Sequence, residues 1–171
     1  MRAAYICVLM AALVDPSVVS SQGTSSFGPS EAAAIQQLFD GYTVAFRAED
    51  YARLREYIQA PFVRFGPSNT RAETEPGDWV VLRTLDDAIG FFRTAQEALK
   101  AQGVERFEWG AMRTTALSPD RALVNKTYRR YRKDGTLVME AASIYVVTKS
   151  SGSWKICGIL NQDPREFGKL H

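Results

Sequence analysis

The sequence predicts an α+β fold, in which helices in the first half of the chain cover one face of a mostly antiparallel sheet that curls around them. Two observations support this fold class. Before Gly103, three stretches carry apolar residues at the spacing typical of amphipathic helices. After it, long segments rich in Val, Tyr, Thr and Ile are separated only by short turns.

Length and composition predict one globular domain with a sizeable core. The chain has 171 residues, of which 46% are hydrophobic and 23% are charged. The net charge of +2 argues against a nucleic-acid partner, and the basic cluster at 129–133 fits a solvated hairpin tip. The only histidine is His171, and the sequence lacks metal-ligand spacing and a Gly-rich phosphate loop, so we expect no metal and no cofactor.

Residues 1–20 resemble a signal peptide, which predicts a secreted or periplasmic protein; without that signal a cytoplasmic protein is expected. A basic residue precedes the apolar run Ala3–Val14, which is too short to span a membrane. Residues 21–30 are rich in Ser and Gly and predict a flexible lead-in. Export would remove Cys7 and leave Cys157 alone, so no intramolecular disulfide is expected.

Each predicted helix combines an apolar face with a polar residue that can cap its N-terminus. Ser30 is the expected cap of the first helix, whose apolar stripe consists of Ile35, Leu38, Phe39, Tyr42 and Phe46. Asp50 caps a second, shorter helix, which runs to Ile58 and ends before the next proline. Thr84 caps the third helix, with Asp87 three residues later as a carboxylate form of the capping box.

The remaining apolar segments predict two short strands followed by four long ones. They are expected at Phe62–Phe65, Trp79–Leu82, Val104–Leu117, Arg121–Arg132, Thr136–Lys149 and Trp154–Leu160. In the first long strand, alternation places Phe107, Trp109 and Ala111 on one face. A polar rim loop separates the two short strands, and residues 163–171 are expected to form a polar tail.

The Asp134-Gly135 dipeptide predicts the register of the hairpin between the second and third long strands. Asp-Gly is typical of a two-residue type I′ turn, which makes the numbers of paired residues sum to 269. One face of this hairpin then pairs Tyr128 with Ala141, Lys126 with Ser143, Val124 with Tyr145, and Ala122 with Val147. The opposite face places Arg129 across from Glu140 as a favourable charge pair.

Three segments carry a family resemblance: Phe46–Asp50 at the end of the first-helix stripe, the strand Phe62–Phe65, and the closing Trp154-Lys155-Ile156. They resemble the nuclear transport factor 2-like superfamily, which includes ketosteroid isomerases and SnoaL-like cyclases. The resemblance covers residues 31–162. It implies a cystatin-like cone, with three helices packed in the concave face of the curved sheet, a ligand or substrate in its mouth, and in many members a dimer.

The resemblance also implies positions for the isomerase groups, and two of the three residues differ. Ketosteroid isomerases combine an Asp base with a Tyr and a protonated Asp as oxyanion donors. Tyr42, eight residues before Asp50, matches the tyrosine. Phe65 stands near the position of the base and cannot take a proton, and Ser143 stands near the second Asp. The mechanism is therefore not transferred, and Tyr42 is the best catalytic candidate.

The match at Ser143 indicates which face of the sheet lines the cone. Lys126, Tyr128 and Tyr145 share that face and are expected to point into the cone, and so are Ile159 and Asn161. Tyr42 and Tyr145 could equally be core aromatics, and Lys126 could extend to the rim with its ammonium in water. The candidate ligand-binding residues are Tyr42, Phe65, Lys126, Tyr128, Ser143, Tyr145 and Asn161.

Three functions stay open at this point. The first is a secreted single-domain protein that binds a small, largely apolar molecule in the mouth of the cone, without an identifiable catalytic set. The second is an isomerase, cyclase or hydrolase of a polyketide- or steroid-like substrate, with Tyr42 as oxyanion donor. The third is a non-catalytic interaction module that forms a homodimer through the outer sheet face around Leu123, Ile144 and Val146.

Overall fold

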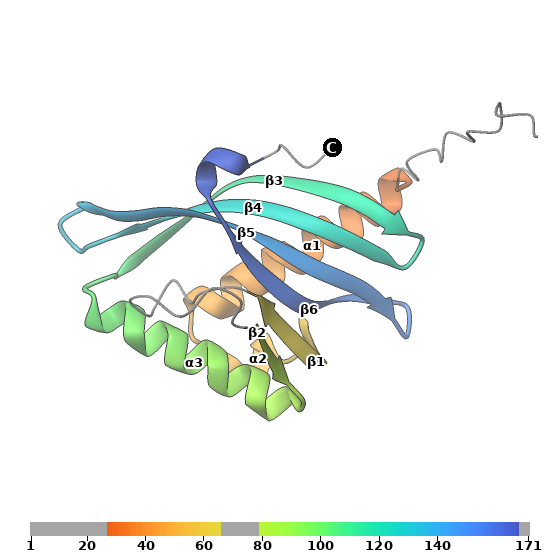
Figure 1. Ribbon diagram of the computed structural model, residues 1–171, viewed down its shortest axis with the longest axis horizontal. Helices are drawn as coiled ribbons and strands as arrows, with labels where there is room; N and C mark the ends of the chain where they lie inside the picture. Colours follow the sequence, from red (N-terminus) through yellow and green to blue (C-terminus); the bar gives the residue numbers. More distant parts are fainter. Residues whose placement is uncertain (1–26, 66–78, 168–171) are drawn as a thin grey trace, which may run out of the picture.

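A six-stranded sheet curves around three helices, and this arrangement confirms the predicted α+β class (Figure 1). The computed structural model describes residues 27–65 and 79–167. The predicted signal peptide and rim loop fall outside these residues, so export stays a prediction. In chain order the elements are α1 (Pro29–Arg47), α2 (Tyr51–Leu54), β1 (Ile58–Phe65), β2 (Trp79–Leu82), α3 (Leu85–Ala101), β3 (Arg106–Ser118), β4 (Arg121–Tyr131), β5 (Leu137–Ser150), β6 (Ser153–Gln162) and the 3₁₀ helix η1 (Pro164–Glu166).

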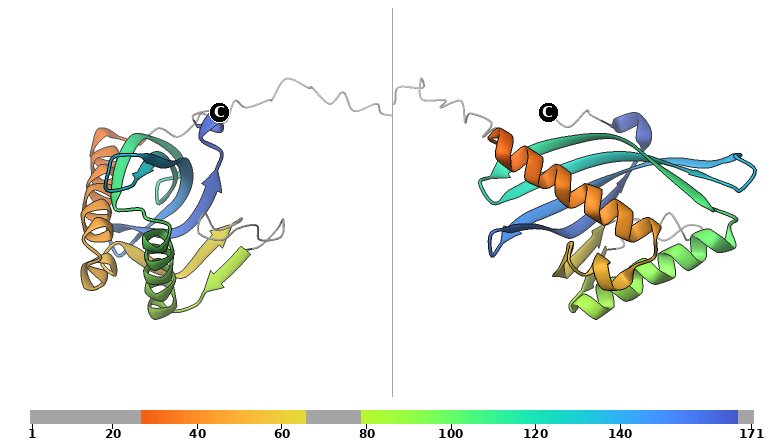
Figure 2. Two further views of the ribbon diagram at one scale, coloured as in Figure 1. Left: turned by 90° about the vertical axis from the view of Figure 1, so that its left-hand side faces the viewer. Right: turned by 180° about the vertical axis from the view of Figure 1, so that it is seen from behind.

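The strands are ordered β2-β1-β6-β5-β4-β3, with β2 and β3 at the two edges. Neighbouring strands are antiparallel except β1 and β6, which run parallel. The sheet curls so that α1 and α3 lie on its concave side (Figure 2). The core fills this side, and its members include Phe39, Tyr42, Phe92, Tyr145 and Ile156. Within the described residues, no helix is long and apolar enough to cross a membrane.

α1 begins earlier than its predicted cap. Gly28 is the N-cap and Pro29 the first helical residue, so Ser30 lies inside the helix. Proline is favoured at this position because an N–H there would have no partner within the helix. Just before the helix, the Phe27 ring packs edge-on against Trp154 with centroids 5.4 Å apart. The chain is thus packed and helical by the end of the segment predicted as a lead-in.

Glu31, in the first turn of α1, ties the helix to the hairpin formed by β5 and β6. Lys149 Nζ and Trp154 Nε1 each donate to its carboxylate at 2.7 Å. The hydrogen bond from Lys149, and then that from Trp154, lower the pKa of Glu31 below its usual value. The carboxylate therefore stabilises the fold while it is ionised.

The second helix is shorter than predicted. It ends at Leu54, and Ile58, expected on its apolar face, is the first residue of β1. Pro61 consequently lies inside a strand, at a point where the register between β1 and β6 is irregular. A proline is tolerated there because the regular ladder is already interrupted.

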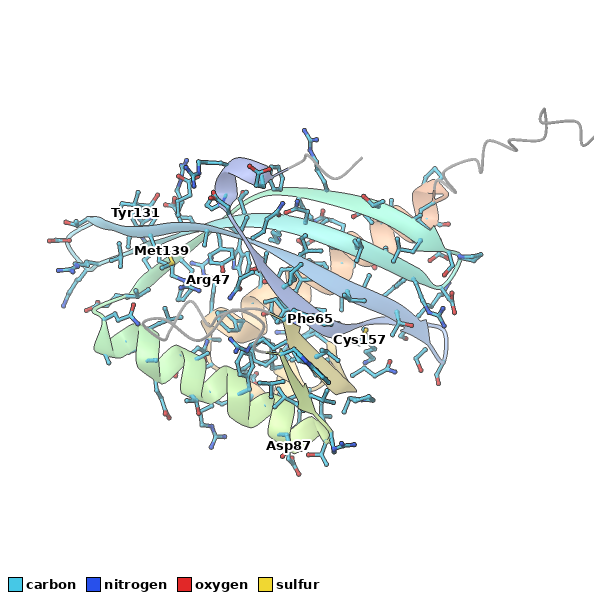
Figure 3. The ribbon with its side chains drawn as sticks, in the orientation of Figure 1. Arg47, Phe65, Asp87, Tyr131, Met139 and Cys157 are labelled. Atoms are coloured by element: carbon cyan, nitrogen blue, oxygen red, sulfur yellow. The ribbon has the colours of Figure 1, made fainter. Side chains whose placement is uncertain are left out.

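The capping box at the start of α3 is confirmed. The Asp87 N–H donates to Thr84 Oγ1 at 3.1 Å, and the Thr84 N–H donates to Asp87 Oδ2 at 3.0 Å. Asp87 is labelled at this end of α3 in Figure 3. Hydrogen bonding from the Thr84 side chain, and then from its backbone N–H, lowers the pKa of the Asp87 carboxyl.

The predicted register of the hairpin between β4 and β5 is confirmed from the Ala122–Val147 pair to the Arg129–Glu140 pair. The predicted type I′ turn is wrong. It requires a positive φ at both Asp134 and Gly135, and of these two only Gly135 has one, of 85°. Arg132 N–H donates to Thr136 O at 2.9 Å, so the loop is one residue longer. A shift next to the Arg130–Met139 pair restores the predicted register.

The two-residue type I′ geometry occurs instead at the next hairpin, between β5 and β6. Ser151 has φ 51° and Gly152 has φ 82°, and the flanking Ser150 and Ser153 are paired. Both central residues of a type I′ turn need positive φ, which Gly adopts without steric cost.

A β-bulge in β6 decides which of its side chains face the helices. The register shifts between the Val147–Ile156 and Val146–Gly158 pairs, so Cys157 is the extra residue. Beyond the bulge, Ile159 is directed toward the helices, as predicted, and packs against the core. Cys157 Sγ lies 3.5 Å from the Val146 carbonyl oxygen, and burial raises the pKa of its thiol.

A second bulge, in β3, corrects the predicted alternation of that strand. The register with β4 shifts between Trp109 and Met112. Ala111, expected on the same face as Trp109, is exposed, and Met112 packs against the core in its place. Single-sequence alternation cannot anticipate this change, because one extra residue reverses the facing of all that follow.

Residues 163–167, the described part of the predicted polar tail, fold back onto the outer face of the sheet. The Asp163 side chain accepts a hydrogen bond from the Arg165 N–H at 2.9 Å and caps η1. The Arg113 guanidinium lies over the Phe167 ring at 5.6 Å. On this same face Ile144 is buried, and Leu123 and Val146 are half-buried. A homodimer through this face stays a prediction.

Two glycine substitutions are expected to change stability in opposite directions. Gly152→Ala places a Cβ on a residue with φ 82° and should lower the unfolding free energy by about 1 kcal/mol. Gly90→Ala, at an exposed position inside α3 with no atom within 4 Å of the new Cβ, should raise it by about 0.5–1 kcal/mol. Urea unfolding of both variants measures the difference, and a stabilising Gly152→Ala would contradict the turn assignment.

Glu31→Gln is expected to lower the midpoint of thermal unfolding at pH 7. Because the folded-state pKa of Glu31 is lowered, its contribution is present above its unfolded pKa and is lost as the pH falls through the folded one. The gap between wild type and variant should therefore shrink in acid. Glu97→Gln, which replaces an exposed glutamate on α3, is the control. A gap that does not depend on pH would contradict the stabilising role of the ionised Glu31 carboxylate.

Candidate functional site

A cavity opens between α1, α3 and the concave face of the sheet. It comprises about 580 Å³, a volume that includes its open mouth. Most of its wall is aromatic or aliphatic, as is usual for small-molecule sites. These apolar wall residues are Phe46 from α1, Phe91, Phe92, Ala95 and Leu99 from α3, and Phe107, Trp109 and Ile159 from the sheet. The polar lining residues are Tyr42, Arg64, Tyr128, Arg130, Tyr145 and Asn161.

Two of the lining tyrosines are almost completely buried. Tyr42 on α1 and Tyr145 on β5 are each 2% exposed, and their ring centroids lie 5.9 Å apart. Burial raises the pKa of both hydroxyls, that of Tyr145 well above its usual value. Both phenols therefore stay protonated at neutral pH. The two hydroxyls also hydrogen-bond to each other, so the pair has one proton left to donate into the cavity, and both groups are poor proton acceptors.

Two buried arginines also line the cavity. Arg130 on β4 and Arg64 on β1 are each 7% exposed. The Arg130 guanidinium lies over the rings of Tyr128 at 5.0 Å and Phe107 at 5.7 Å, and Arg64 lies over Phe91 at 5.8 Å. Burial lowers the pKa of Arg130, whereas the nearby tyrosines raise it. An arginine nevertheless stays charged, because its usual pKa lies far above neutrality.

The structure brings together four of the seven candidate ligand-binding residues. Tyr42, Tyr128, Tyr145 and Asn161 line the cavity. Phe65 does not: it is 40% exposed, and the neighbouring Arg64 takes the inward position. Figure 3 shows Phe65 on β1, the strand on which the two residues point to opposite faces. Ligand binding by the four lining residues stays a prediction.

Ser143 and Lys126 face the concave side but do not line the cavity. Ser143 is completely buried, and its Oγ lies 3.3 Å from the Tyr128 hydroxyl. Lys126 is 5% exposed, and its Nζ lies 5.0 Å from the Trp109 ring and 5.4 Å from the Phe39 ring. Burial lowers the pKa of Lys126, and the charge of Asp40 opposes this effect. The ammonium is therefore held against aromatic rings and does not extend to the rim.

Both lining arginines were missed by reasoning from sequence. Arg130 belongs to the basic cluster at 129–133 that was assigned to a solvated hairpin tip. It pairs with Met139, and the predicted register already places it on the same face as Tyr128. That shared face was the signal that could have identified it. Arg64 had no such signal, because the adjacent Val63 and Phe65 made the opposite face of β1 look equally apolar.

As far as the structure describes the chain, the lining offers hydrogen-bond donors but no group suited to take a proton. Among the described residues, no Asp, Glu or His lines the cavity. In the same part of the chain, no group of three His, Cys, Asp or Glu side chains could hold a metal ion. The arrangement can therefore enclose an apolar molecule and donate hydrogen bonds to it.

Solved structures of other proteins share this fold. An NTF-2 like protein of unknown function from Shewanella oneidensis aligns with a TM-score of 0.57 and 16% identity, over 78% of this chain and 99% of its own. A domain of unknown function with a cystatin-like fold from Nostoc punctiforme aligns with a TM-score of 0.60 and 17% identity, over 80% and 78%. A ketosteroid isomerase-like protein from Erwinia carotovora aligns with a TM-score of 0.56 and 19% identity, over 80% and 100%. Identities this low establish the fold alone.

Comparison of the sequence with curated proteins finds no match. The sequence model of a family described as "NTF2-like protein (DUF6841)" matches residues 30–164, which is most of the chain. This match and the shared cystatin-like fold confirm the resemblance to the nuclear transport factor 2-like superfamily. The chain therefore belongs to the NTF2-like family DUF6841.

Proposed function

We propose that this protein binds a small, largely apolar molecule in the cavity of the cone and does not catalyse a reaction on it. The observation that supports this most directly is the composition of the lining. Aromatic and aliphatic side chains from α1, α3 and the sheet form the wall, and the polar groups among them are phenols, guanidinium groups and one amide. Such a site can desolvate and orient a ligand.

An isomerase, cyclase or hydrolase is the second candidate, and one observation favours it. Tyr42 lines the cavity, and its raised pKa keeps the hydroxyl protonated, which is the state that an oxyanion donor needs. The same chemistry also needs a base within reach of the substrate. The described lining residues supply no carboxylate or imidazole for this role, so binding without catalysis is the function better supported.

The uncharged fluorescent probe N-phenyl-1-naphthylamine is expected to bind saturably to the wild-type protein. Ala95→Phe fills the cavity from α3 and should weaken this binding at least about tenfold. Thr94→Phe is the matched control, because it adds the same ring at the neighbouring, exposed position of the helix. Fluorescence titration measures both variants, and circular dichroism checks that they fold. Equal binding by wild type and Ala95→Phe would place the probe elsewhere and overturn the proposal.

Lys126→Met is expected to leave binding of the same probe within about twofold of wild type, because Lys126 does not line the cavity. The unfolding free energy should change by less than about 1 kcal/mol. The variant loses the contacts of the ammonium with Phe39 and Trp109 but also loses the cost of burying a charge. Probe titration and urea unfolding measure the two quantities. A tenfold loss of affinity in a folded variant would show that Lys126 does contribute to binding.

A further inference from the structure

The cavity contains a buried positive charge to which no described residue supplies a counter-charge, and an entirely apolar ligand would supply none either. Arg130 forms one hydrogen bond to a side chain, from Nη1 to the weak acceptor Met139 Sδ at 3.3 Å. Its Nε, also buried, has no hydrogen-bond partner among the described residues. None of the ion pairs formed within that part of the chain includes Arg130.

A guanidinium in these surroundings is costly to bury unless an anion shares the site. A charge removed from water loses its hydration and is stabilised only by a counter-charge and good hydrogen bonds. The nearby groups that favour the charged form of Arg130 belong to Tyr128, Tyr145 and Tyr42, and none of them is a carboxylate. Arg64 brings a second guanidinium to the same cavity from β1. Over the described residues, the lining thus carries two positive and no negative side chains.

We propose that the ligand is a carboxylic acid, bound as its anion, with its carboxylate paired to Arg130 and its apolar body against the aromatic wall. This inference rests on the proposed function and specifies the class of molecule that the cavity binds. The planar guanidinium presents parallel N–H donors that match the two oxygens of a carboxylate. A phosphate dianion would bring a larger charge into a mostly aromatic wall, where its desolvation is harder to offset.

The matched probes 2-naphthoate and 2-naphthamide test the proposal, because they share one ring system and differ in charge. Competition with N-phenyl-1-naphthylamine or calorimetry gives both affinities. Wild type should bind the naphthoate at least about tenfold more tightly, equivalent to about 1.4 kcal/mol. Arg130→Met should remove this preference by weakening naphthoate binding about tenfold, with naphthamide binding unchanged within about twofold.

Arg129→Met is the matched control variant. Arg129 is the preceding residue of the same strand, but it is exposed on the opposite face, where its Nη2 lies 3.3 Å from Glu140 Oε1. Its replacement removes the same charge from the protein without changing the cavity. Both naphthoate and naphthamide affinities should stay within about twofold of wild type, which separates a local contact from a general effect of net charge.

The outcomes distinguish this inference from the proposed function. Equal wild-type affinity for naphthoate and naphthamide overturns the carboxylate assignment, and the proposed function survives if the uncharged probe still binds. Tighter binding of 2-naphthyl phosphate than of 2-naphthoate overturns it as well. Failure of every probe to bind overturns the proposed function, and this inference with it. If Arg130→Met does not fold, the comparison of the two probes on wild type still decides.

Discussion

The structure depends on the packing of one aromatic stripe of α1 against the concave face of the sheet. Tyr42 lies at its centre, with its ring centroid 5.8–6.2 Å from those of Phe39, Phe46, Phe92, Trp109 and Tyr145. Each such pair adds about 0.5–1.5 kcal/mol beyond the area that it buries. These partners belong to α1, α3, β3 and β5, so one cluster joins both long helices to the sheet. Several of the same rings form the cavity wall, and the site is therefore continuous with the core.

Much of the fold could be predicted because its signals are local. Helical spacing located α1 and α3, and the Thr84–Asp87 pair fixed the start of α3. The register of β4 and β5 was predicted correctly for a partly wrong reason. The turn is one residue longer than the Asp-Gly signal suggests, and a shift at the base of the loop cancels that difference. The longer strands then keep their pairing because a slip would turn their apolar face away from the helices.

The candidate site was harder to predict because its polar residues depend on facing, which bulges and short strands leave undetermined. Near the end of β1 each face carries an apolar residue, Phe62 on one and Val63 on the other, so alternation could not assign Arg64 and Phe65 to a face. Arg130 had a correct register but was interpreted by its neighbours in sequence. Lys126 was expected to be a ligand contact or to extend to water, and neither possibility anticipated the rings of Phe39 and Trp109 around its ammonium. Those rings come from α1 and β3, which only the folded chain brings together.

The bulge at Cys157 links the facing of the end of β6 to the chemistry of the cavity. Ile159 and Asn161 reach the lining because one extra residue in β6 shifts the facing of the strand end. If the ladder ran on from Ile156 without this bulge, regular alternation would direct Leu160 and Gln162 toward the helices in their place, with the strand order preserved. The presence or absence of one bulge can thus exchange the side chains that a ligand meets without altering the fold. Members of this fold class can diverge in binding by the gain or loss of a bulge, as well as by substitution.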